Sequence, residues 1–157
     1  MRASEVRVRA GDAELAGYLS VPPNGRGVVL FAHGSGSSRH SSRNQCVADI
    51  LQDAGMATLL IDLLSPVEEA RDDITGELRF DIPFLADRLQ GASDWLAEYP
   101  STAELPLGYF GASTGGGAAL VAAAQRPDVA AVVSRGGRPD LAERFLKDVK
   151  APTIDSW

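Results

Sequence analysis

Residues 106–120, PLGYFGASTGGGAAL, contain the turn that decides the fold. The apolar run LGYF has the length and character of a buried strand, the pentapeptide GASTG at 111–115 follows it, and a helix of small residues comes next. A Gly-x-Ser-x-Gly turn between a strand and a helix is strained and projects the serine hydroxyl above the sheet. The pattern therefore predicts that Ser113 occupies the position of an acyl-transfer nucleophile.

This glycine-rich turn has a second interpretation, because such turns also cradle phosphates or simply allow close packing. A phosphate loop is expected to carry a lysine near its end, and no lysine occurs between Gly111 and Gln125. The nucleophile interpretation also explains the segment FAHGSG at 31–36, which ends another apolar run. In α/β-hydrolases this loop donates one backbone N–H to an oxyanion, and the residue after the nucleophile donates the other.

By position, the two oxyanion donors are the amides of Ser35 and Thr114. We expect His33 to order the loop through its ring nitrogens, with Gly34 supporting the loop beside it. Around this site, strand and helix patterns alternate along the whole chain, which predicts an α/β fold: a mostly parallel sheet of about six strands with helices on both faces. The expected strands are a hairpin around Gly11-Asp12 and the runs 27–32, 56–63, 106–111 and 129–134; the expected helices begin near 42, 85, 115 and 141.

Two segments carry local predictions of their own. In the helix that begins at Ser42, a capping box of Ser42 with Gln45 is expected, and Cys46 is placed on the core-facing side as a buried, inert thiol. The charged stretch 65–81, SPVEEARDDITGELRFD, follows the carboxyl end of a strand, where α/β sheets bind ligands. It is interpreted as a solvated loop, with a border of a substrate pocket as the alternative.

Composition restricts the classes of partner. The chain has 157 residues, 45% hydrophobic and 23% charged, and is interpreted as one domain over 1–157. Its net charge of -6 argues against nucleic acid or an anionic membrane as partner. One cysteine and two histidines predict no internal disulfide and no metal site. The absence of an apolar leader and of a long apolar run predicts a cytoplasmic protein.

Three segments together resemble the dienelactone-hydrolase-like family of the α/β-hydrolases. They are FAHGSGSSRHSSRN at 31–44, GYFGASTGGGAAL at 108–120 and VVSRGGRPDLA at 132–142, in the family's order. The resemblance implies hydrolysis of a small carboxylic ester or lactone without a cofactor. The residues favour the same function, a serine hydrolase with an acyl-enzyme at Ser113.

The chain departs from the family on the C-terminal side of Ser113. The fold's order is nucleophile, acid, histidine, yet no histidine occurs after Ser113, so we expect a domain that is incomplete at its C-terminus and lacks its last strands. A serine without a base is a poor nucleophile. His40 is the candidate base and Asp140 the candidate acid; a surface-loop histidine and a helix cap are the alternatives. A second chain is the remaining source of a base.

An incomplete sheet would leave an unpaired edge and partly bare helix faces, which predicts a homodimer through that edge. The missing base also supports a different function, that of a catalytically impaired fold acting as a binding or assembly module. The two functions differ in one testable property: only the hydrolase needs an activated serine at position 113.

Overall fold

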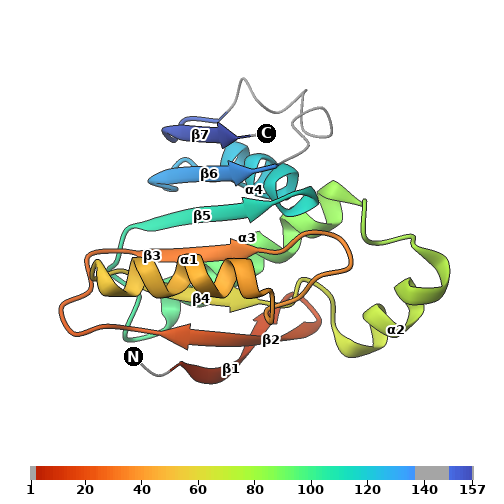
Figure 1. Cartoon of the computed structure of the whole chain (residues 1–157), viewed down its shortest axis with the longest axis horizontal. Coiled ribbons are helices and arrows are strands. Elements are labelled where there is room, and N and C mark those ends of the chain that lie inside the picture. The colour runs from red at the N-terminus through yellow and green to blue at the C-terminus, as the bar shows by residue number, and fades with distance from the viewer. Residues whose placement is uncertain (1–2, 137–148, 157) are drawn as a thin grey trace.

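A computed structural model describes residues 3–136 and 149–156, and its centre is a seven-stranded sheet (Figure 1). The strand order is β1-β2-β4-β3-β5-β6-β7. The α/β architecture is confirmed, but the count of about six strands is low because residues near the C-terminus add β7 beside β6. The strands are β1 Ser4–Ala10, β2 Ala13–Ser20, β3 Val28–Ala32, β4 Ala57–Ile61, β5 Leu107–Ala112, β6 Ala131–Arg135 and β7 Thr153–Ser156.

The sheet is antiparallel at one side and parallel in the rest. β1 and β2 form the predicted hairpin, with Gly11 at a φ of +60°, and β2 pairs antiparallel with β4. β4, β3, β5, β6 and β7 then pair in parallel. Every residue of β4 is buried, as expected for a strand with helices on both faces. The carboxyl ends of the parallel strands therefore meet at one edge of the sheet.

Helices cover both faces (Figure 1). One helix lies on one face over a small core of Phe31, Ala48, Leu60 and Phe110, while the opposite face carries the main core and two packed helices. Within residues 3–136 and 149–156, no helix is long and apolar enough to cross a membrane. The helices are α1 Ser42–Asp53, α2 Pro66–Thr75, α3 Ile82–Glu98 and α4 Thr114–Gln125; the helix expected from 141 lies outside the described residues.

Helix α1 corrects two of the local predictions. Its N-cap is Ser41, whose side chain accepts from the amide of Asn44, and no capping box starts at Ser42. The helix turns Asn44 and Ala48 toward the sheet, so Cys46 is exposed and not buried. The physical reason is the helical repeat: at about 100° per residue, Cys46 lies about 160° around the helix axis from both Asn44 and Ala48. Asn44 Oδ1 also accepts a hydrogen bond from Arg135 of β6.

The segment expected as a solvated loop instead contains helix α2. Ser65 caps it in a reciprocal capping box with Glu68, Pro66 occupies its first position, and Gly76 ends it at a φ of +67°. The sequence contains these helix start and stop signals, but the high charge of the segment favoured the interpretation as a solvated loop. In Figure 1 α2 projects from the side of the sheet to which the parallel strands point, away from α3 and α4.

Candidate active site

Ser113 stands in a strained turn between β5 and α4. Its φ is 56° and its ψ is -123°, a conformation that residues with a side chain seldom adopt. The turn is fixed from both sides: the Ser113 amide donates to the Arg135 carbonyl at 3.0 Å, and the Ser113 carbonyl accepts from the Gly116 amide at 2.9 Å. The side chain is exposed at the tip, as an attacking hydroxyl requires.

Two glycines make this turn possible. A Cβ on Gly111 would stand 2.4 Å from the carbonyl oxygen of Gly115, and a Cβ on Gly115 would stand 2.2 Å from that of Ala32. Both obstacles are backbone atoms, which cannot rotate away. Strand β5, helix α4 and the end of β3 are therefore in direct backbone contact beneath Ser113.

The loop after β3 lies directly beside the serine. A Cβ on Gly34 would be 3.0 Å from Cβ of Ser113 and 3.7 Å from its Oγ. Thr114 begins α4, so its amide has no carbonyl one turn earlier in the helix to bind. The positive end of the helix dipole lies at the same place. Ser35 is exposed and borders the same cavity as Thr114, so the structure brings the two predicted oxyanion donors to one site.

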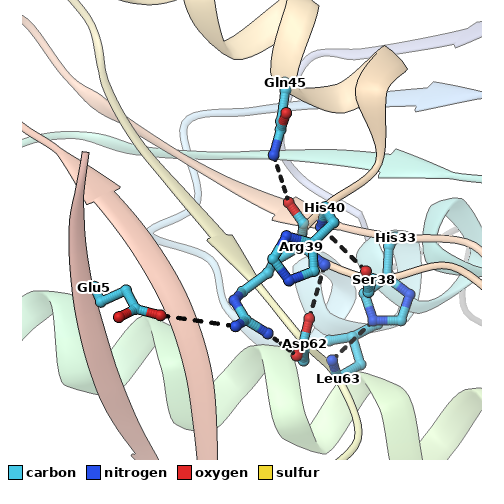
Figure 2. A network of polar contacts seen from close by, with 8 residues as sticks. All are labelled: Glu5, His33, Ser38, Arg39, His40, Gln45, Asp62 and Leu63. Atoms are coloured by element: carbon cyan, nitrogen blue, oxygen red, sulfur yellow. Dashed lines mark hydrogen bonds and ion pairs between the residues drawn. The ribbon is translucent and has the colours of Figure 1, made fainter. Parts of the chain in front are cut away.

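His33 joins this loop to the end of β4 (Figure 2). Its Nε2 accepts from the Leu63 amide at 2.9 Å, so the ring proton resides on Nδ1, which donates to the Gly34 carbonyl at 2.8 Å. Burial lowers the pKa of His33, and the Gly34 hydrogen bond with the charges of Asp62 and Glu69 only partly offsets this. The imidazole is therefore neutral at pH 7, with both nitrogens occupied.

Arg39 fixes the far end of the loop (Figure 2). Its amide donates to Asp62 Oδ1 at 2.7 Å and its guanidinium to Oδ2 at 2.5 Å. The guanidinium also lies 4.9 Å from the Tyr18 ring centroid and 3.8 Å from Glu5. The loop from His33 to Arg39 is thus attached to β4 at both ends.

The structure does not bring His40 to Ser113. The His40 ring contacts Tyr18 of β2 edge to face at 5.5 Å, and the residue is exposed. β4 and β3 lie between β2 and β5, so the strand below His40 and the strand leading to Ser113 are separated by about 14 Å, three strand spacings. Asp140, the candidate acid, lies outside the described residues.

A cavity that is open to solvent lies beside Thr114, between the loop after β3, the end of β4 and helix α2. The acidic side of this cavity was not predicted from the sequence. The signal that could have found it is the position of residues 65–81 after the carboxyl end of a strand, which made the border of a pocket the alternative interpretation. The residues that line the cavity and carry charge are Asp62, Glu69, Asp72, Asp73 and Arg79.

Two ion pairs hold the α2 side of the cavity. Glu68 binds Arg88 of α3 through both carboxylate oxygens, at 2.7 and 2.6 Å. Burial would raise the pKa of Glu68, but the hydrogen bonds from Arg88 and Ser65 together with the Arg88 charge lower it.

The second pair lies at the C-terminal end of α2. The buried carboxylate of Asp72 accepts from the Leu78 amide at 2.7 Å and from Arg79 Nε at 3.1 Å, while Arg79 Nη2 donates to the Asp72 carbonyl at 2.7 Å. Burial alone would raise the pKa of Asp72, but the Leu78 and Arg79 hydrogen bonds outweigh it and lower the pKa. Asp72 and Arg79 therefore neutralise one another inside the cavity wall.

Known proteins resemble this chain at two levels. A crystal structure of a dienelactone hydrolase from Anabaena variabilis is 61% identical, with a TM-score of 0.95 over 99% of this chain and 73% of that one. An esterase of Pyrococcus furiosus is 15% identical, with a TM-score of 0.74 over 98% of this chain and 69% of that one, and shows the fold alone. No protein-family model matches the sequence.

Two curated proteins of Mycobacterium tuberculosis, from strains H37Rv and CDC 1551, are 60% identical to this chain over 156 residues. Each is provisionally named a phosphoribosyl transferase. The match covers 98% of this chain but only 34% of each of those proteins. Two thirds of the protein that bears the name therefore lies outside the matched part.

Proposed function

The chain belongs to the dienelactone hydrolase family of α/β-hydrolases, and from that premise we propose that it hydrolyses small carboxylic esters or lactones through an acyl-enzyme at Ser113. The observation that carries the proposal is the strained turn at Ser113, with the backbone of Gly34 against the serine side chain. A nucleophile held in this way meets a substrate carbonyl between two backbone amides.

The chemistry would run in two steps. Ser113 Oγ adds to the carbonyl carbon and loses its proton to a base, and the resulting oxyanion accepts hydrogen bonds from the Ser35 and Thr114 amides. Each such donor contributes roughly 2.7–4 kcal/mol, because it meets the full negative charge only in the tetrahedral intermediate. The C–O bond to the alcohol then breaks, the alcohol leaves with a proton, and water hydrolyses the acyl-serine to free the acid.

Neither histidine of the sequence is placed to serve as that base. His33 uses Nε2 to accept from Leu63 and Nδ1 to donate to Gly34, and His40 lies over β2. We therefore propose that the base comes from outside the described residues. A second copy of the chain remains our proposed partner, through β7, the outer strand on the parallel side of the described sheet, where Ile154 is exposed.

Chemical rescue tests the hydrolase directly. Hydrolysis of p-nitrophenyl acetate is measured with and without added imidazole, for the wild-type protein and for Ser113→Ala. We expect imidazole to raise the wild-type rate above that of Ser113→Ala by at least about tenfold, because imidazole supplies a proton acceptor that the described residues do not place beside Ser113. Equal rates for both proteins at all imidazole concentrations would contradict an acyl-enzyme at Ser113.

A binding or assembly module is the second candidate function, and the positions of the two histidines favour it. Covalent labelling of Ser113 by a fluorophosphonate at ordinary rates would exclude this candidate, since labelling requires an activated serine. The charge of the cavity disfavours phosphoribosyl transfer. A phosphoribosyl donor is strongly anionic, whereas four carboxylates and a single guanidinium line the cavity beside Thr114.

A further inference from the structure

We propose that the cavity beside Thr114 selects substrates that are neutral or cationic in the part reaching toward α2, and rejects those with a carboxylate there. This names the substrate class of the site and rests on the proposed function only for the identity of the bond that reacts. Three features of the cavity support this selectivity: an excess of negative charge, an arginine that is already paired with a carboxylate, and a buried hydroxyl without a hydrogen-bond partner.

The first feature is an excess of negative charge. Asp62 is neutralised by Arg39 and Asp72 by Arg79, through the ion pairs described above. Glu69 and Asp73 line the same cavity, are exposed, and form no ion pair among residues 3–136 and 149–156. A substrate carboxylate in this cavity would therefore meet two carboxylates of like charge.

The second feature is the lack of a spare cation. Arg79 lines the cavity, but its Nε and Nη2 both bind Asp72. His33, which also lines it, is held neutral because burial lowers its pKa. The charge of Arg79 is therefore balanced by Asp72, and no other lining residue carries a positive charge to pair with a substrate anion.

The third feature points to a polar ligand. Thr114 is 2% exposed and lines the cavity, and its Oγ1 has no hydrogen-bond partner in the described part of the chain. A buried hydroxyl without a partner costs free energy, which an uncharged oxygen or amide of a ligand would recover once the Thr114 side chain turns toward the cavity. The wall at Thr114 thus favours a neutral polar group, while the wall at Glu69 and Asp73 disfavours an anion.

Binding to the Ser113→Ala protein tests this without depending on hydrolysis. Dissociation constants are measured by NMR titration for N-methylhexanamide, the mono-N-methylamide of adipic acid, and 6-amino-N-methylhexanamide. These ligands share the amide and differ in a neutral, anionic or cationic end. We expect the anionic ligand to bind about tenfold more weakly than the neutral one, and the cationic ligand at least as tightly as the neutral one.

Removal of the Glu69 and Asp73 carboxylates should abolish this gap in affinity between the neutral and anionic ligands. In Ser113→Ala carrying Glu69→Gln and Asp73→Asn, the neutral and anionic ligands should bind within about threefold of each other. The control carries Glu98→Gln and Glu104→Gln, two exposed carboxylates outside the cavity lining, and should keep the full gap. Thr114→Val should weaken all three ligands by a similar factor.

Several outcomes overturn the proposal. They are an anionic ligand that binds as tightly as the neutral one, a gap that survives Glu69→Gln with Asp73→Asn, a gap that closes equally in the control, and no measurable binding of any of the three. A protein that fails the imidazole test but shows the expected ligand preference would lose its proposed function and keep this selectivity. The two failures are therefore distinguishable.

Discussion

The turn around Ser113, which reaches the cavity through Thr114, and the α2 arm, residues 65–80, which borders the same cavity, are held in place by opposite means. Beneath the turn, backbone meets backbone: the space for a Cβ at Gly115 is already filled by the Ala32 carbonyl. The arm is attached to α3 by a charged pair, Glu68 with Arg88, while Asp72 with Arg79 links two residues within the arm. Its large apolar residues Val67 and Ile74 face solvent.

This difference has a physical consequence for the two regions. A backbone contact allows almost no displacement, so the turn is expected to be rigid and intolerant of any added atom. A helix held to its neighbour by one ion pair, with its large apolar residues exposed, is expected to open locally at a lower free energy than the sheet. The site thus combines a fixed nucleophile position with an adjustable wall.

The largest effect is expected from Gly115→Ala. The new Cβ would stand 2.2 Å from the Ala32 carbonyl oxygen, so β3 and α4 must separate, and we expect a loss of about 3 kcal/mol or more in the free energy of unfolding. Urea unfolding measures it. Gly25→Ala is the control, because its nearest neighbours are 3.6 Å away, and it should change stability by less than about 1 kcal/mol. Equal effects would contradict the rigid turn.

A medium effect is expected from Arg88→Met, which leaves Glu68 without its partner. The Arg88 side chain is 12% exposed and that of Glu68 26%, so we expect α2 to open about 1–2 kcal/mol more easily, measured by hydrogen exchange of the α2 amides. Arg71→Met is the matched control. Its 3.8 Å pair with Glu77 is exposed on both sides and should contribute less than about 0.5 kcal/mol. If both variants behave alike, the arm is held by something other than its Glu68 pair.

A smaller effect is expected from a change of pH. The pH dependence of the free energy of unfolding should distinguish His33, in the loop after β3, from the carboxylates of the α2 arm. The pKa of His33 is lower in the folded state than in the unfolded chain, so the stability that its neutral form supports is complete above about pH 6.5 and is lost as pH falls through the folded pKa. For Glu68 and Asp72 the pKa is also lowered, so their contribution is complete above about pH 4 and is lost below it.

Urea unfolding of the wild type and of His33→Gln between pH 8 and pH 3 checks this assignment. The wild type should begin to lose stability below about pH 6.5, whereas His33→Gln should remain level until the carboxylates titrate near pH 4. Identical curves for the two proteins down to pH 5 would show that His33 does not titrate with unfolding.

The smallest effect is expected from Ile74→Gln. Ile74 is 87% exposed, so removing its apolar surface should change the free energy of unfolding by less than about 0.5 kcal/mol and leave hydrogen exchange of α2 unchanged. A loss above 1 kcal/mol would mean that apolar contacts of the arm, and not its ion pairs, hold it in place.

The fold was predictable wherever hydrophobic periodicity was strong. The hairpin, the buried strands of the sheet and helices α3 and α4 follow directly from it. Prediction failed in α1, where the polar residue Asn44 is buried and hydrogen-bonded to Arg135, and Cys46 on the opposite side of the helix is exposed. It also failed at α2, where Ser65, Pro66 and Gly76 marked a helix inside a stretch whose high charge favoured a loop.

The candidate site was predictable only in its backbone part. The turn around Ser113 and the loop from His33 to Ser35 lie together because parallel strands end at one edge, a property that strand order in the sequence already implies. His40 follows the same loop by a few residues, yet its ring lies against Tyr18 of β2. No local pattern reports that contact, since it depends on how the hairpin joins the sheet beside β4.

The sequence by itself determined the α/β architecture and the location of the Ser113 turn, because Gly111 and Gly115 are local requirements of a strained strand-to-helix turn. The tertiary structure alone decided which charges face the cavity and which are neutralised. Arg39 meets Asp62, and Arg88 meets Glu68, across 23 and 20 residues of chain. Only the assembled sheet brings such pairs together, and so it alone leaves Glu69 and Asp73 to set the charge of the cavity.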